Sequence, residues 1–167
     1  MANQNAVYQT PPLGEVGGLA TTNYANPLNA VPGCRVNGAA QVGGFVWATS
    51  APSGTNPNSM EQFVTNSAAS GSPVGFVYRV QDQALPCNSG YTQAIANGQA
   101  CPVADGGCFY ATPTTSAVVG QKVFASLSNG AVLQTASAGA TVSGYVETDF
   151  TVKTPASSGG IMVIEAK

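Results

Sequence analysis

The sequence predicts an all-β protein, with a β-sandwich, jelly-roll-like or small barrel body behind an extended N-terminal arm. Only 7% of the 167 residues are charged, whereas 44% are hydrophobic, and disordered chains have the opposite balance. Valine and aromatic residues are frequent, and these side chains favour pleated, half-buried surfaces. Short apolar runs recur about every ten residues with turn residues between them, which indicates a sandwich or a barrel.

Residues 1–30 are predicted to form the arm. They contain the pair Pro11-Pro12 and several glycines, and paired prolines favour an extended course. The apolar side chains of the arm follow no regular period; they are Val7, Tyr8, Leu13, Val16, Leu19 and Tyr24. Two interpretations stay open for such a segment: a disordered tail, or a strap that orders on a neighbouring surface.

Residues 31–167 are predicted to form the β-rich body, which could divide into two lobes at about 31–80 and 81–167. In its first half, strands are expected at 45–48, 61–65 and 74–80, where apolar residues alternate or run together between turn signals. Residues 91–96 fit either a strand or one helical turn.

A hairpin is predicted around Asp105-Gly106-Gly107, between strands at 101–104 and 108–111. Cys101 and Cys108 would then face each other, which permits a disulfide. The alternative is that all cysteines are small buried thiols, as expected for a chain made in a reducing cytoplasm. No two of the four cysteines, Cys34, Cys87, Cys101 and Cys108, have C-x-x-C spacing, so a zinc site is not expected.

The last third carries the clearest local signal. Runs at 122–127 and 131–135 flank Ser128-Asn129-Gly130, and Asn-Gly supplies the positive φ angles of a tight hairpin turn. Two more strands are expected at 143–151 and 160–165. The last is apolar on both faces, which predicts a central position in the sheet.

Reactive groups are scarce. The chain has no histidine, which excludes Ser-His-Asp and Cys-His catalysis and imidazole metal ligands. Glu147 and Asp149 stand two residues apart on one predicted strand, about 7 Å from each other. They could hold a cation or act as an inverting glycosidase pair, but a solvent-facing strand surface is the favoured interpretation. We therefore expect no enzyme, no cofactor and no metal.

Charge and hydropathy limit the partners. Five Lys or Arg against seven Asp or Glu cannot build the basic stripe of a nucleic-acid-binding protein. No apolar stretch approaches the ~20 residues of a membrane span, and the N-terminus lacks the pattern of a secretory signal. The aromatic residues in predicted strands are expected to pack in the core rather than to form a carbohydrate platform; they are Trp47, Phe76, Tyr78, Phe109, Tyr110 and Phe124.

Several segments resemble those of tailed-bacteriophage capsid decoration (cement) proteins. They are GFVYRVQDQAL at 75–85, VADGGCFYA at 103–111 and VVGQKVFASLSNGAV at 118–132. The strand at 120–125, the Gly-Tyr-Val stretch within 143–146 and the closing strand at 160–165 follow the pattern of that family. The resemblance covers roughly residues 8–166. Residues 88–100 are less apolar than in the family, and the cysteines have no family role.

The resemblance implies a non-enzymatic virion protein, made in the host cytoplasm, that binds the outer surface of an icosahedral capsid. It would bridge neighbouring subunits of the major capsid protein, often as a homotrimer whose contact comes from residues 75 onward. The arm residues expected to touch the capsid or a neighbouring copy are Tyr8, Pro11, Pro12, Leu13, Leu19 and Tyr24. The alternative is an exposed head or fibre β-domain for adhesion or carbohydrate binding, with an aromatic patch or an acidic cation site on one face.

Overall fold

The computed structural model describes residues 14–20, 27–52, 54, 61–80 and 93–167, and across them the secondary structure is entirely β, as predicted. The strands in chain order are β1 (Asn29–Val31), β2 (Cys34–Val36), β3 (Ala40–Gln41), β4 (Phe45–Ala48), β5 (Gln62–Thr65), β6 (Gly75–Val77), β7 (Ala94–Ile95), β8 (Val103–Ala111), β9 (Lys122–Ser126), β10 (Leu133–Ala136), β11 (Tyr145–Val152) and β12 (Met162–Ala166). None of the described residues forms a helix long and apolar enough to cross a membrane.

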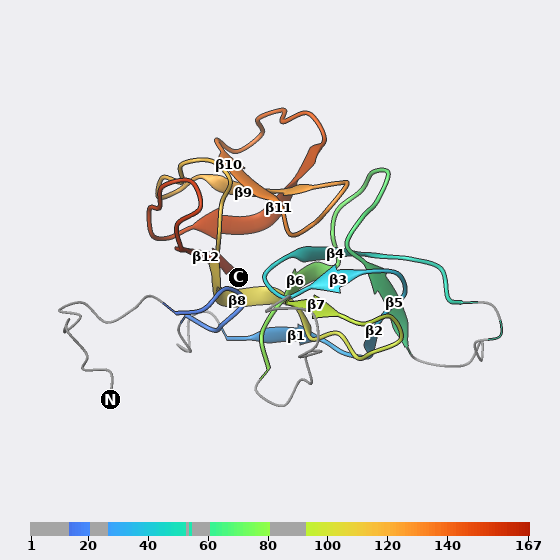
Figure 1. Cartoon of the computed structure of the whole chain (residues 1–167). Helices are drawn as coiled ribbons and strands as arrows, with labels where there is room; N and C mark the ends of the chain where they lie inside the picture. The colour runs from blue at the N-terminus through green and yellow to red at the C-terminus, as the bar shows by residue number, and fades with distance from the viewer. Residues whose placement is uncertain (1–13, 21–26, 53, 55–60, 81–92) are drawn as a thin grey trace, which may run out of the picture.

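One large sheet holds most of these strands. Its order is β10-β9-β11-β12-β8-β6-β4-β5-β2; β1 adds to β8 beside this path, and β3 and β7 pair separately. All pairs are antiparallel except β2 with β5. Figure 1 shows β9, β10 and β11 at one end and β2 to β7 at the other, with β8 and β12 between them. The closing strand β12 lies between β11 and β8, which confirms its predicted central position.

Strands β4, β6 and β8 form a wall between two hydrophobic clusters. The large cluster contains Phe45, Phe76 and Ala104 together with side chains of β9 to β12. Their neighbours in the chain, Val46, Val77 and Val103, belong to the small cluster, with side chains of β2 and β5. Successive side chains of a strand point to opposite faces, so one strand serves both clusters. Each cluster draws on residues before and after residue 80, and the division into two lobes stays a prediction.

Aromatic rings fill the centre of the large cluster. Phe76 lies 5.2 Å from Phe109 and 5.3 Å from Phe45 between ring centroids, and Phe150 lies 5.4 Å from Phe45. Such tilted and edge-on pairs add about 0.5–1.5 kcal/mol each beyond the burial of their area. Trp47 and Phe124 are also buried, which confirms the core role predicted for Trp47, Phe76, Phe109 and Phe124. Tyr110 is only partly buried, and its ring lies against Gly14 and Gly18 instead of in either cluster. Tyr78, only partly buried, packs on Phe109 at 5.9 Å.

The predicted hairpin at residues 101–111 is wrong. Strand β8 runs without reversal through Asp105-Gly106-Gly107. Opposite this point the register with β1 slips, since Asn29 faces Gly106 whereas Ala30 faces Ala104. An extra residue inserted in this way is a β-bulge, which bends a strand but does not reverse it. Gly106 and Gly107 therefore lie at a bulge, where Gly107 adopts a φ of 127°. The segments on either side belong to one strand.

The hairpin of β9 and β10 is confirmed, but its turn differs from the prediction. Gly130 does not adopt the positive φ of a tight Asn-Gly turn. Its N–H donates to the carbonyl of Asn66 at 2.7 Å, and its own carbonyl accepts from the N–H of Phe45 at 2.9 Å. A Cβ at position 130 would overlap the Phe45 carbonyl. Close approach of two backbones, and not turn geometry, requires this glycine.

Strand β4 forms at the predicted residues 45–48, and the remaining predicted strands form with altered lengths. The run at 74–80 yields only the three residues of β6, and the ambiguous segment 91–96 contributes β7, which pairs with β3. Residues 91 and 92 lie outside the described part of the chain.

Candidate functional site

Residues 14–20, here called the N-terminal segment, lie along the second half of β8. The N–H of Gly17 donates to the carbonyl of Tyr110 at 2.8 Å, and the N–H of Tyr110 donates to the carbonyl of Gly18 at 2.9 Å. Further along, the N–H of Ala20 donates to the carbonyl of Cys108 at 2.8 Å. Strand β1 then pairs with the first half of β8 in the same antiparallel sense. Figure 1 shows both pieces, in blue, beside β8. Residues 14–20 and β1 are thus held against β8 of the same chain.

Interlocking glycines shape the contact between the N-terminal segment and the body. A Cβ at Gly14 would overlap the ring of Tyr110, and one at Gly17 would overlap Val42. On the other side, a Cβ at Gly43 would overlap Val16. Gly17 also has a φ of 81°, in the left-handed region that other residues rarely adopt. These positions therefore accept only glycine without a shift of the backbone or of the facing side chain.

Arg79 links the N-terminal segment to β6. Its N–H donates to the carbonyl of Gly17 at 2.7 Å, and its guanidinium pairs with Glu15 at 3.3 Å. With the Gln93 amide turned so that its nitrogen donates to the carbonyl of Val42, its oxygen accepts from Nη2 of Arg79 at 3.2 Å. The Glu15 side chain is 75% exposed, so this ion pair adds at most about 1 kcal/mol. Backbone hydrogen bonds and packing hold the segment in place.

Of the predicted contact residues, only Leu19 lies in the described part of the chain. It forms a β-bridge with Phe109 and is 38% exposed. The others, Tyr8, Pro11, Pro12, Leu13 and Tyr24, lie outside the described residues. The contacts through Gly14, Gly17 and Arg79 were not predicted, because nothing local in the sequence says which strand the segment will meet.

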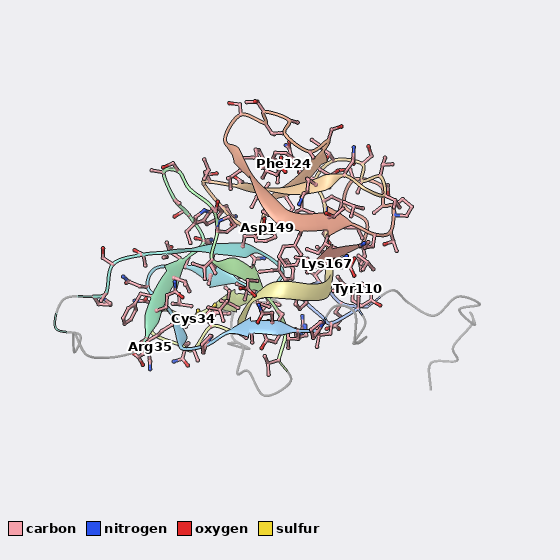
Figure 2. The ribbon with its side chains drawn as sticks, turned by 180° about the vertical axis from the view of Figure 1, so that it is seen from behind. Cys34, Arg35, Tyr110, Phe124, Asp149 and Lys167 are labelled. Carbon is pink, nitrogen blue, oxygen red and sulfur yellow. The ribbon has the colours of Figure 1, made fainter. Side chains whose placement is uncertain are left out.

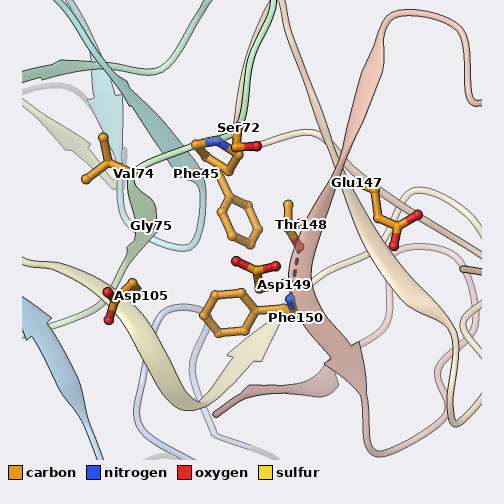
Figure 3. Close-up of a pocket in the computed structure, with 10 residues that line it drawn as sticks. Phe45, Ser72, Val74, Gly75, Asp105, Glu147, Thr148, Asp149 and Phe150 are labelled. Atoms are coloured by element: carbon orange, nitrogen blue, oxygen red, sulfur yellow. Dashed lines mark hydrogen bonds between the residues drawn. The ribbon is translucent and has the colours of Figure 1, made fainter. Parts of the chain in front are cut away.

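A small acidic pocket opens where β11 passes β6 and β8 (Figure 3). Its lining includes Asp105, Glu147 and Asp149. Figure 3 shows the carboxylates of Glu147 and Asp149 on opposite sides of β11, whose register with β9 shifts between Glu147 and Thr151, so the two do not share the face predicted for them. Glu147 accepts a hydrogen bond from the N–H of Gly139 at 2.7 Å, and Asp149 is exposed. The volume is about 40 Å³, far below the several hundred Å³ of typical ligand pockets. Among the described residues, no group of His, Cys, Asp and Glu is arranged to hold a metal ion.

Cys34, Cys101 and Cys108 are buried free thiols, and Cys87 lies outside the described residues. The alternative of buried thiols therefore holds for these three residues, and Cys101 and Cys108 do not face each other because both belong to one extended stretch of chain around β8. Burial raises the pKa of the Cys34 and Cys108 thiols. Burial, assisted by the nearby Cys34 thiolate, raises the pKa of Cys101 to about 12.

Most Lys and Arg side chains of the described residues form ion pairs or hydrogen bonds within the chain. Arg35 pairs with Glu61 at 2.6 Å, and Lys153 pairs with Glu165. Lys122 donates to the backbone carbonyl of Asp149 at 2.9 Å. The described surface is accordingly dominated by uncharged side chains, and no reactive constellation emerges on it.

Comparison with known proteins supplies the biological context. The family model of the XM1 gp53 minor capsid protein matches residues 4–166. A chain of the solved capsid of Myoviridae phage XM1 shares the fold, with a TM-score of 0.57 and 18% sequence identity over 99% of this chain and 97% of that chain. No curated protein sequence matches. Because the family model covers nearly the whole sequence, the chain belongs to the XM1 gp53 minor capsid protein family, and so to the structural proteins of phage capsids.

Proposed function

We propose that this chain is a non-enzymatic cement protein that binds the outer surface of an icosahedral phage shell and bridges neighbouring major capsid subunits. The observation that carries the proposal is the match of a minor capsid family over residues 4–166. A minor capsid component of this kind needs a rigid body and contact surfaces rather than a catalytic centre.

The surface chemistry supports close packing of identical copies. With 12 charged residues in 167 and three ion pairs closed within the described chain, little like-charge repulsion opposes self-association at a symmetry axis. We propose a homotrimer whose contact uses the body from residue 75 onward. Weak capsid contacts joined in one oligomer become strong through effective concentration.

The N-terminal segment supports a role for the residues that precede it. Because residues 14–20 are bonded to β8, any contact made by residues 1–13 is anchored directly to the body. We assign Tyr8, Pro11, Pro12 and Leu13 to contact with the capsid or a neighbouring copy. Leu19 and Tyr24 complete the proposed set.

Binding to shells that lack the protein tests the proposal. Purified full-length chain is mixed with such shells, which are sedimented, and its copy number is measured against the major capsid protein. We expect a number approaching one per shell subunit, whereas a few copies per particle would contradict the cement role and favour a fibre or portal component.

Deletion of residues 2–13 tests the arm without disturbing the bonds to β8. We expect lower occupancy for the deletion, and for the double variant Tyr8→Ala/Leu13→Ala. The double variant Asn3→Ala/Asn5→Ala, in the same stretch, is the matched control and should bind normally. Full occupancy of the deletion variant would reject the arm contacts while leaving the copy-number result intact.

Adhesion or carbohydrate binding is the alternative function. In the described part of the chain, no aromatic side chain is exposed; the large exposed apolar residues are Leu19, Leu28, Val80, Val118 and Val119. No described feature therefore favours a sugar platform. A glycan array with the purified protein separates the two functions, since specific glycan binding would support adhesion.

A further inference from the structure

Two buried thiols face each other across a short antiparallel contact between β2 and residues 99–101. Arg35 of β2 forms a β-bridge with Ala100. On one side of this bridge, Val36 donates its N–H to the carbonyl of Gln99 at 2.9 Å. On the other, Cys101 donates its N–H to the carbonyl of Cys34, also at 2.9 Å. Cys34 and Cys101 are therefore directly opposite each other.

This placement meets the backbone requirement of a disulfide. Opposed residues of an antiparallel pair have Cα atoms about 4.5–5.5 Å apart, and their side chains leave the same face. Disulfides span Cα separations of about 4.4–6.8 Å. Both cysteine side chains belong to the small cluster. The thiolate of Cys34 also acts on the titration of Cys101, as expected for close neighbours.

The other described thiol is placed elsewhere. Cys108 lies on the second half of β8, where its carbonyl accepts from the N–H of Ala20, and the charge of Lys153, not a second thiol, acts on the pKa of its thiol. Figure 2 shows Cys34 beside Arg35 and well apart from Tyr110, two residues beyond Cys108 on β8. Among the described cysteines, the pairing partner of Cys101 is therefore Cys34.

We propose that Cys34 and Cys101 form an oxidation site that closes an intramolecular disulfide when the protein leaves a reducing compartment. The oxidant is a small-molecule disulfide such as oxidised glutathione. One cysteine thiolate attacks it, forms a mixed disulfide and releases one glutathione thiol. The second cysteine then attacks the mixed disulfide and releases the other glutathione thiol. The protein loses two electrons and two protons, and the oxidant gains them.

The new bond would tie β2 to the stretch leading into β8. It closes a loop that contains β3 to β7, all the strands between the two cysteines. A cross-link around so long a loop restricts the unfolded chain strongly. Disulfides persist in extracellular media and are reduced in the cytoplasm, so the bond would form after release from the cell. This inference does not depend on the proposed capsid role.

The test uses the full chain with Cys87→Ser and Cys108→Ser, which leaves only the proposed pair. The reduced protein is incubated with oxidised glutathione and, in parallel, refolded from denaturant in a glutathione redox buffer, where burial no longer limits access to the thiols. We expect loss of about 2 Da in intact mass and a linked peptide pair containing residues 34 and 101. The melting temperature should rise by about 5–15 °C over the reduced form.

The matched control adds Cys34→Ser to the same background. It should show neither the mass loss nor the melting shift. In the wild-type chain, peptide mapping should give the same 34–101 link despite the presence of Cys87 and Cys108. A refolded pair variant that stays reduced, or a wild-type link from Cys101 to Cys87 or Cys108, would overturn the proposal.

Discussion

The N–H of Phe45 donates a hydrogen bond of 2.9 Å to the carbonyl oxygen of Gly130, and this bond joins β4 to the loop between β9 and β10. A methyl group at position 130 would overlap the Phe45 carbonyl, so Gly130→Ala forces two backbones apart. We expect a loss of about 2–4 kcal/mol in the free energy of unfolding, measured by urea denaturation. Gly139→Ala, at an open site with a φ of 74°, should lose only about 1 kcal/mol.

Gly17 and Gly98 provide a matched test of the N-terminal segment. Their φ values are 81° and 80°, but a Cβ at Gly17 would overlap Val42 whereas one at Gly98 meets nothing within 4 Å. Gly17→Ala should release the segment, so that the Tyr110 N–H, which donates to Gly18, exchanges with solvent hydrogen at least tenfold faster. Gly98→Ala pays only the strain of its φ and should leave that exchange unchanged. Equal exchange in both variants would contradict the interlocking contact.

Thr148 satisfies two backbone groups inside the large cluster. Its hydroxyl donates to the carbonyl of Val123 at 2.9 Å and accepts from the N–H of Phe150 at 3.3 Å. Thr148→Val keeps the shape but leaves both groups without a partner, and should cost about 1–3 kcal/mol in thermal or urea unfolding. Thr135→Val removes a comparable bond to Ser116 at an exposed site, where water replaces it. A loss there as large as at Thr148 would argue against a burial effect.

The buried thiols make the stability of the reduced protein fall in alkali. The pKa of Cys101 is raised from 9.0 to about 12 by burial, so above pH 9 the unfolded chain releases this proton before the folded chain does. The contribution is complete below pH 9 and disappears as the pH rises toward 12. The free energy of unfolding, measured by urea denaturation in a reductant, should fall between pH 8 and pH 10.5 by on the order of 1 kcal/mol more in the parent than in Cys101→Ala. Identical pH slopes in the two proteins would contradict this origin.

Local pattern predicted the all-β class and most strands of the last third, because alternation and apolar runs act over a few residues. The local pattern failed where the conformation of a glycine is set by a backbone segment distant in the sequence. Asp105-Gly106-Gly107 signalled an unusual conformation, but only its partner β1 makes that conformation a bulge. Gly130 signalled a turn, but its constraint comes from Phe45, far away in the sequence.

The candidate site shows the same limit. The prolines and glycines of residues 1–30 predicted an extended arm, but they did not predict that residues 14–20 bond to β8. The contact depends on Gly17 and Gly43, and neither reveals from sequence that Gly17 will lie against Val42 or that Val16 will lie against Gly43. Long-range pairing of this kind depends on the whole fold.

The seating of residues 14–20 on β8 also decides how tension travels through the molecule. A pull parallel to β8 on the chain ahead of Gly14 would load the hydrogen bonds that join residues 17–20 to Cys108 and Tyr110. These bonds lie side by side and share the load in shear instead of parting one at a time. From β8 the load spreads sideways into β12 on one part of the strand and β6 on the other, so both hydrophobic clusters resist it together.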